Sequence, residues 1–386
     1  MGFSEDTKAE QGGSVAANRY LRRAVDKCLG DGIDREQVAE ALVRMAETVH
    51  SEIAEERAEY RVAPDLPDSF DQVPVGNECG CGGWVYSAEH HFCSRCGAAL
   101  TPSLVPKAIP GRLQFERRIG KGGSGVVYEA LDLSLGRRVA VKTLPTVCSP
   151  NDIARLRREA QTLAAVSHRN LAIVYGFKVY RGTPMIIMEF VDGSTLAERI
   201  PLPLDVAIEV MLQVTEVVGC LHKAGVVHRD IKPRNIAFTG GGELKLLDFG
   251  LARLEREATL SGVAGHVVVG TPAYLSPEAH AHHRANPSFD LWALSVTFYE
   301  ILCGHRPAEA GSPEELVEAI KGHRLTPIGD RLPQRPPILD QFFEGAFAVE
   351  LSSRPRTAIQ FARRLSDLRQ EAERDGGCMA SANLPE

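Results

Sequence analysis

Four short motifs follow one another in a fixed order along the middle of this chain. They are the glycine pattern of RIGKGGSGVVYEALD, the run VAVK, the segment HRDIKPRN and the run LKLLDFG, which together span residues 118–250. A single G-x-G-x-x-G is a weak signal, and in a dinucleotide-binding fold it would have to open a helix. Here VVYEALD continues with a strand pattern, so we expect the glycines to lie in a hairpin that can close over phosphate groups.

The lysine of VAVK is a second indication of phosphate binding, because it ends an apolar strand pattern. An unpaired ammonium group in apolar surroundings is costly, so Lys142 needs anionic partners. Glu159, in the helical pattern IARLRREAQTLAAV, is one candidate partner, and the phosphates of ATP are the other.

Taken in order, these motifs resemble the signature set of protein kinases. The resemblance covers residues 113–368, about two thirds of the chain, and it points to serine/threonine kinases of the bacterial type. It implies an α+β, two-lobed fold with ATP in the cleft. The small lobe is expected to consist of an antiparallel sheet with one helix, and the large lobe is expected to be mostly helical.

The resemblance also implies a reaction, in which the γ-phosphate of ATP passes to serine or threonine hydroxyls of protein substrates in cytoplasmic signalling. Asp230 then matches the base that accepts the hydroxyl proton, and Lys232 supplies positive charge to the phosphoryl group. Asn235 and Asp248 match the oxygen ligands of Mg²⁺. The residues expected to bind ATP are Ile119, Gly120, Gly122, Gly125, Val127, Ala140, Lys142 with Glu159, Glu189, Val191 and Ala237, with Met188 as gatekeeper.

Two contacts of the segment after Asp248 are expected from the same resemblance. Glu278 of GTPAYLSPE should pair with Arg354 of SSRPR and tie this segment to the large lobe. Thr271 should contact both the base and the catalytic lysine.

The arginine before the catalytic aspartate predicts regulation by phosphorylation. Kinases with that pair commonly need a phosphate on the activation loop, where it can pair with Arg229 and order the loop. Tyr274 and Ser276 lie in the turn expected to dock substrate, which leaves Thr259 and Ser261 as the candidate sites.

Four of the nine cysteines lie within 18 positions, in ECGCGGWVYSAEHHFCSRCGAAL. A reducing cytoplasm disfavours disulfides, so the two close pairs predict thiolates around one metal ion, with zinc the first choice. The second pair has the C-x-x-C-G form of half a zinc ribbon, whereas the first pair is one residue shorter than usual. The predicted ligands are Cys79, Cys81, Cys93 and Cys96, with His90 or His91 left open as a replacement within the first pair. Four ligands predict a closed, structural site.

The rest of the chain divides by composition. One apolar stripe at steps of three and four runs through DREQVAEALVRMAETVHSEIAEERAEY and predicts a long helix. The expected regions are a helical N-terminal region at 1–63, a linker at 64–77, the zinc-ribbon-like module at 78–100, a proline-rich linker at 101–112, the kinase region at 113–368 and a polar tail at 369–386.

Charge and hydropathy limit the partners. The net charge is −6, and residues 1–75 alone carry 16 acidic and nine basic residues. That balance argues against a phosphate-backbone partner, which requires a basic surface. No apolar run approaches the roughly 20 residues of a membrane span, and the N-terminus lacks a signal-peptide pattern, so we expect a cytoplasmic protein without a membrane span. The sequence indicates no oligomeric state.

Two other function classes are alternatives to a kinase. A pseudokinase scaffold would normally have lost Lys142, Asp230 or Asp248, and all three are present. A nucleic-acid-directed regulator built around the zinc ribbon is the other alternative. It is disfavoured because Arg95 is the one basic residue among residues 78–100.

Overall fold

The computed structural model of the chain describes residues 72–122, 125–144, 150–247 and 271–374. All of them belong to one unit that comprises residues 65–386. The predicted helical region 1–63, the magnesium ligand Asp248, the candidate phosphorylation sites Thr259 and Ser261, and residues 375–386 of the predicted tail lie outside the described residues.

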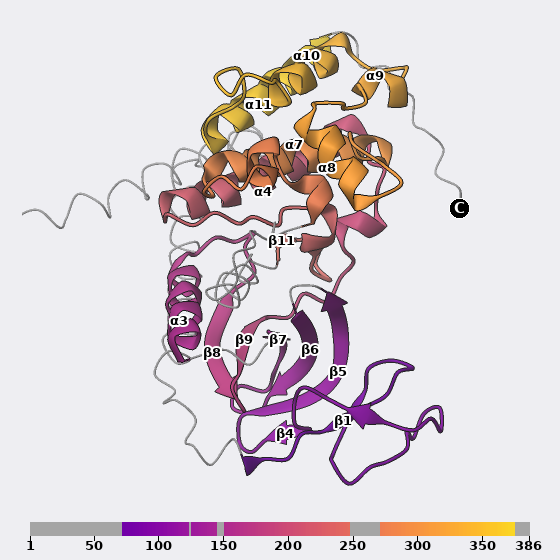
Figure 1. The fold of residues 1–386 in the computed structure, drawn as a ribbon, viewed down its shortest axis with the longest axis vertical. Coiled ribbons are helices and arrows are strands. Elements are labelled where there is room, and N and C mark those ends of the chain that lie inside the picture. Colours follow the sequence, from indigo (N-terminus) through magenta and orange to yellow (C-terminus); the bar gives the residue numbers. More distant parts are fainter. Residues whose placement is uncertain (1–71, 123–124, 145–149, 248–270, 375–386) are drawn as a thin grey trace, which may run out of the picture. The chain divides into compact units, whose positions relative to one another are not determined.

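A six-stranded antiparallel sheet carries the glycine and VAVK motifs (Figure 1). Its order is β4 (Ala108–Ile109), β5 (Leu113–Gly122), β6 (Gly125–Asp132), β7 (Arg137–Thr143), β9 (Thr183–Glu189) and β8 (Val174–Tyr180). The β-branched and aromatic residues of these segments favour strands, because their side chains pack well on a pleated surface. Helix α3 (Pro150–Ala165) contacts β8 and β9.

A second, three-stranded sheet lies ahead of the first in the sequence. It has the order β2 (Val85–Tyr86), β1 (Asn77–Glu78) and β3 (Thr101–Pro102), and we call residues 76–105 the cysteine module. Its strands are two residues long, and the turns between them carry the four clustered cysteines.

The structure differs from the expectation of a proline-rich linker at 101–112. Residues of this segment form β3 in the cysteine module and β4 in the six-stranded sheet. Between these strands Val105 is fully buried, and its carbonyl accepts a hydrogen bond from the Gly76 amide at 2.9 Å. The segment is ordered because its apolar residues, not its prolines, determine where it lies.

The second half of the described chain is mostly helical. Its elements are η2 (Leu196–Glu198), α4 (Leu204–Lys223), η3 (Pro233–Asn235), the two-stranded sheet of β10 (Ile236–Phe238) and β11 (Leu244–Leu246), η4 (Pro272–Tyr274), α6 (Pro277–His280), α7 (Pro287–Cys303), α8 (Pro313–Lys321), α9 (Ile328–Arg331), α10 (Pro337–Ala346) and α11 (Ala358–Arg374). Helix α11 begins after SSRPR and runs six residues into the predicted tail. Among the described residues, no helix is both long and apolar enough to cross a membrane.

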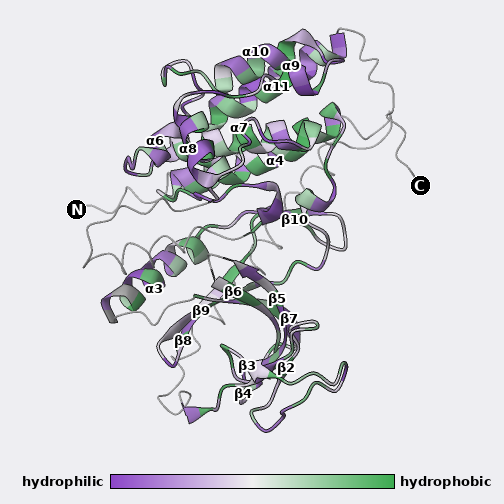
Figure 2. Cartoon of the chain, turned by 45° about the vertical axis from the view of Figure 1, so that its right-hand side comes forward, coloured by the Kyte–Doolittle hydropathy of each residue, from purple (hydrophilic) through white to green (hydrophobic). Residues whose placement is uncertain are grey.

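Helices α4 and α7 form the centre of this helical part. They contact each other, and Figure 2 shows hydrophobic residues along both. α7 is buried on nearly every side, from Phe289 to Leu302. Its sequence FDLWALSVTFYEIL is correspondingly apolar all round, as expected of a helix inside a core.

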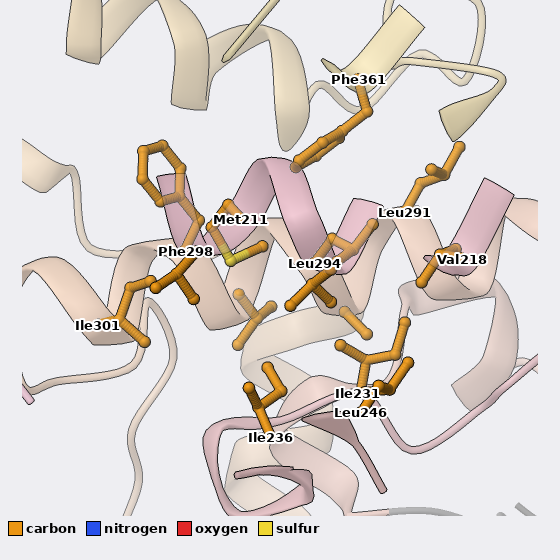
Figure 3. Close-up of a cluster of buried hydrophobic side chains, with 14 of the residues drawn as sticks. Met211, Val218, Ile231, Ile236, Leu246, Leu291, Leu294, Phe298, Ile301 and Phe361 are labelled. Atoms are coloured by element: carbon orange, nitrogen blue, oxygen red, sulfur yellow. The ribbon is translucent and has the colours of Figure 1, made fainter. Parts of the chain in front are cut away.

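The same core reaches the segment HRDIKPRN. Ile231 and Ile236 are fully buried in a cluster that includes Met211 of α4 and Leu294 of α7 (Figure 3). Leu246, at the end of β11, belongs to the same cluster. The polar residues between these apolar ones are therefore held on a fixed support.

Candidate active site

Residues 228–235, the catalytic loop, are held in place by a carboxylate on α7. Asp290 is 0% exposed, and its Oδ2 and Oδ1 accept hydrogen bonds from the backbone amides of His228 at 2.8 Å and Arg229 at 2.7 Å. The His222 Nε2 lies 2.8 Å from the same carboxylate. Arg229 has a φ of 68°, which is strained for a residue with a side chain. The hydrogen bonds to Asp290 offset the energetic cost of this backbone conformation.

Asp230 stands at the centre of a polar cluster. The Lys232 ammonium donates to its two carboxylate oxygens at 2.9 and 2.7 Å, and the Asn235 amide nitrogen donates to Oδ2 at 2.8 Å and to the backbone carbonyl of Asp230 at 2.7 Å. The loop thus brings together three of the four residues that the sequence predicts to be catalytic. The fourth, Asp248, lies outside the described residues.

The environment keeps Asp230 ionised. Burial alone would raise the pKa of its carboxyl, but the nearby Lys232 charge and the hydrogen bonds from Lys232 and Asn235 lower that pKa below its ordinary value. The group is therefore a deprotonated hydrogen-bond acceptor at neutral pH, which is the state a base requires.

Thr271, which is 41 residues from Asp230 in the sequence, joins this cluster. Its hydroxyl accepts from Lys232 at 2.7 Å and donates to Asp230 Oδ1 at 3.2 Å. The prediction that Thr271 contacts both residues is confirmed.

The residue before Asp248 is bonded to the catalytic loop. The Leu247 amide donates to the Asn235 carbonyl at 2.7 Å, and the Leu247 carbonyl lies 3.1 Å from His228 Nε2. Because the Asn235 amide nitrogen is engaged with Asp230, its Oδ1 is the atom that can ligate a cation. An amide oxygen is a ligand that Mg²⁺ accepts, and the other predicted ligand, Asp248, lies outside the described residues.

The glycines lie in a hairpin, as predicted. Strands β5 and β6 pair down to Gly122 opposite Gly125, with Gly120 opposite Val127. Gly125 has a φ of 118°, and a Cβ there would lie 2.2 Å from the Thr143 carbonyl oxygen, so glycine is required.

Lys142 lies in the middle of the sheet and is 2% exposed. Its strand neighbours are Val127 on β6 and Ile186 on β9. Glu159 is half-buried on α3, which contacts β8 and β9. The pairing of Lys142 with Glu159 stays a prediction.

The residues expected around the adenine come from both halves of the chain. Ala140 and Ala237 are buried, Val127 is half-buried, and Met188 of β9 pairs with Ala140 of β7. Ala237 of β10 forms a bridge with Thr195. Val191 is half-buried just after β9. Their contact with adenine stays a prediction.

Glu189 carries contacts that the sequence did not suggest. Its amide donates to the Ile173 carbonyl at 2.8 Å, and its carboxylate pairs with the Lys245 ammonium at 2.8 Å. With its amide engaged, the Glu189 carbonyl is the backbone group that can accept from a nucleotide. The sequence analogy places Asp290 in the long central helix of kinases, but the hydrogen bonds that Asp290 makes to the catalytic loop were not predicted, although an acidic residue at the start of an apolar helix is a signal that could have found them.

The predicted pair of Glu278 and Arg354 is confirmed. Arg354 Nη1 lies 3.1 Å from each carboxylate oxygen, and the guanidinium stacks over the Trp292 ring at 4.7 Å. Burial opposes ionisation of Glu278, yet its own backbone amide and Arg354 lower the pKa of the carboxyl below its ordinary value. The pair ties α6 to the segment before α11.

The cysteine module brings its four cysteines together. The sulfur of Cys79 lies 3.1 Å from that of Cys81 and 3.4 Å from that of Cys96, and the sulfurs of Cys81 and Cys93 are 3.9 Å apart. All four lie within 4.8 Å of one another, and no histidine joins this group in the described part of the chain.

The donor set suits a tetrahedral metal ion. Four sulfurs at about 2.3 Å from one zinc ion are separated by distances of this size. The Tyr86 hydroxyl lowers the pKa of the Cys93 thiol to about 6, whereas contact with Cys79 and Cys96 raises the pKa of Cys81 to about 12. Crowded thiols cannot all ionise alone, so a fully deprotonated cluster requires a cation at its centre.

Comparison with known proteins gives the same assignment for the larger part of the chain. The family described as protein kinase domain matches residues 113–370. The chain is 36% identical over 269 residues to the serine/threonine-protein kinase PknA of Mycobacterium tuberculosis. This match covers 67% of this chain and 61% of PknA. It is 31% identical over 269 residues to the probable serine/threonine-protein kinase pknA2 of Bifidobacterium longum, covering 67% of this chain and 35% of that protein.

Among solved structures, the chain resembles Rad53 residues 1–466 in complex with AMP-PNP. The TM-score is 0.54 at 23% identity, with 65% of this chain and 64% of the other covered. This similarity shows the two-lobed fold. The chain spans between about a third and about three fifths of the length of the curated relatives named above.

Proposed function

Because the chain belongs to the protein kinase family, we propose that it transfers the γ-phosphate of ATP to serine or threonine hydroxyls of protein substrates. One observation carries the proposal, namely the cluster in which Lys232, Asn235 and Thr271 all bond to the Asp230 carboxylate. The two bacterial relatives, whose names describe serine/threonine kinases, support the substrate class.

The catalytic cluster divides the work among its members. Asp230, ionised and aimed by three neighbours, accepts the proton of the attacking hydroxyl and orients its oxygen toward the phosphorus. Lys232 lies beside Asp230 and offers positive charge where negative charge develops on the transferred group. Thr271 bonds to both side chains and keeps their spacing.

Nucleotide and metal are assigned to the remaining predicted residues. Lys142 and the glycine-rich hairpin bind the phosphates, and Val127, Ala140, Ala237, Glu189 and Val191 surround the adenine, with Ile119 at the rim. Asn235 and Asp248 would hold Mg²⁺, which neutralises phosphate charge when bound. Thr259 and Ser261 remain the proposed sites of autophosphorylation.

For the cysteine module we propose one structural zinc ion held by Cys79, Cys81, Cys93 and Cys96. The clustering of the four sulfurs supports it. With all four positions filled by protein, such a site has no open position for chemistry. None of the six described cysteines forms a disulfide, which suits the cytoplasmic location that we propose for the protein.

The decisive experiment incubates the full chain with γ-labelled ATP, Mg²⁺ and a test protein rich in serine and threonine, followed by mapping of the phosphorylated residues. We expect phosphoserine and phosphothreonine on the test protein. The matched control is Asp230→Asn, which should lower the rate by roughly 10²- to 10⁴-fold while ADP binding is kept. Equal transfer by both proteins would show that Asp230 is not the base.

A further inference from the structure

The glycine-rich hairpin is attached at its base to the cysteine module. The Arg118 amide, on β5, donates to the Gly83 carbonyl of the module at 2.7 Å, and the Arg118 guanidinium forms an ion pair with Glu78 of β1. Glu78 directly precedes the first cysteine of the cluster, and Arg118 stands two residues before the first glycine of the motif. The two motifs are thus joined through Arg118, which bonds to both Glu78 and Gly83.

Glu78 contacts both strands of the hairpin. It is 8% exposed, and besides Arg118 on β5 it accepts a hydrogen bond from the Tyr128 hydroxyl on β6 at 3.2 Å. Tyr128 and Arg118 face each other in the register of the two strands. A buried carboxylate bound by two charged or polar partners is a strong local constraint. Removing the carboxylate leaves both partners without their bond, and removing one partner leaves the carboxylate short of one bond.

The turn that follows Cys79 approaches β5 very closely. Gly83 has a φ of 65°, and a Cβ there would lie 2.7 Å from the Cβ of Arg118. Trp84, the next residue, forms a β-bridge with Arg117. Backbone contact on this scale requires that the turn of the cysteine module and the hairpin move together.

Beyond Arg118 the hairpin leaves this support. Ile119 is 39% exposed, and a Cβ at Gly122 would have no atom within 4 Å. The register shifts between Arg118 and Gly120, which marks a bulge directly after the anchored residue. A bulge redirects the strand beyond it, so the contact at Arg118 determines where the glycines point.

We infer that Arg118 is a positioning residue for ATP, and that the cysteine module, through Glu78 and Gly83, holds the glycine-rich hairpin in its nucleotide-binding position. The inference rests on the proposed kinase function and names a part of the chain outside the matched family region that serves it. In the part of the chain that the structure describes, the bonds of Glu78 and Gly83 go to the hairpin and within the cysteine module, so their effect should fall on nucleotide affinity and leave the chemical step intact.

The experiment compares full-length Glu78→Gln, Arg118→Met and Arg118→Lys with the wild type. The dissociation constant for ATP with Mg²⁺ and the kcat at saturating ATP are both measured. We expect ATP to bind about tenfold more weakly to Glu78→Gln and Arg118→Met, with kcat within about twofold of the wild type. Arg118→Lys keeps the charge opposite Glu78 and should recover part of the affinity.

Two controls separate this effect from general damage. Glu89→Gln makes the same charge change at an exposed position of the same module and should leave ATP affinity unchanged. The double variant Glu78→Gln/Arg118→Met should bind ATP no more weakly than the weaker of the two single variants, because both changes remove the same Glu78–Arg118 ion pair.

The inference is overturned if folded Glu78→Gln and Arg118→Met bind ATP as the wild type does, or if they lose kcat while keeping their affinity. A wild type that binds ATP but transfers no phosphate would overturn the proposed activity alone, and the comparison of dissociation constants would still decide the role of Arg118.

Discussion

The catalytic loop and the glycine-rich hairpin are held in place by different parts of the chain. The loop is fixed from inside the helical part, by the buried Asp290 and by Ile231 and Ile236 in the core. The hairpin is fixed at its base by Glu78, which lies before the family region of residues 113–370. The catalytic loop is therefore supported by the kinase domain itself, whereas the proposed nucleotide contact of the hairpin is supported by residues outside the family region.

The largest effect should come from removing the support of the catalytic loop. Asp290→Ala leaves the backbone amides of His228 and Arg229, and the His222 side chain, without their acceptor, which should lower the free energy of unfolding by about 3–5 kcal/mol and kcat by at least about 100-fold. Chemical denaturation and kinetics at saturating ATP measure the two effects. Asp290→Asn keeps one acceptor oxygen and should fall between. A kcat within twofold of the wild type in folded Asp290→Ala would contradict the comparison.

A smaller effect, on affinity, is expected from disrupting the cysteine cluster. Cys93→Ser/Cys96→Ser should lose the bound zinc and bind ATP several-fold more weakly, while kcat at saturating ATP stays close to the wild-type value. Metal analysis and nucleotide titration are the measurements. The matched control is Cys220→Ser/Cys303→Ser, two half-buried cysteines of the helical part, which should retain the metal. Metal-free wild type prepared under reducing conditions would contradict the zinc proposal.

The smallest expected effect is a displacement of the acidic limb of the pH profile. The proposed role of Asp230 as base requires its deprotonated form, so activity should be present above the pKa of its carboxyl and lost as pH falls through that pKa. Burial raises that pKa, and the charge of Lys232 is the largest of the effects that lower it. In Lys232→Met the pKa of Asp230 should rise, and the acidic limb of kcat/KM should move to higher pH. An acidic limb that stays in place would show that Lys232 does not control the ionisation of Asp230.

Much of the site in the helical part was predictable from the sequence, because the residues that make its contacts lie in motifs that are typical of kinases. The bonds of Thr271 to Asp230 and Lys232, and the pair of Glu278 with Arg354, were expected and are present. The paired glycine hairpin was also expected, since a strand pattern follows the glycines directly.

The support of the hairpin was not predictable. Glu78 and Arg118 are 40 residues apart and carry no pattern that pairs them. Residues 101–112, which lie between them, contain three prolines, so their composition indicates a linker, yet the burial of Val105 and Ile109 orders this segment. Periodicity reports which residues of one segment share a face, and it cannot report which of two segments covers the other.

The short strand β4 has a consequence for cutting the chain into fragments. It pairs with Leu113 and Gln114, and beyond it Lys107 exchanges hydrogen bonds with Phe115 through backbone and side chain. A protein that begins at residue 113 would turn β5 into a bare sheet edge, with unpaired amides beside the fully buried Phe115. Such an edge recruits strands from other molecules. A fragment chosen from the motif boundaries alone would therefore be prone to aggregate, because it would lack the strand β4 that pairs with β5.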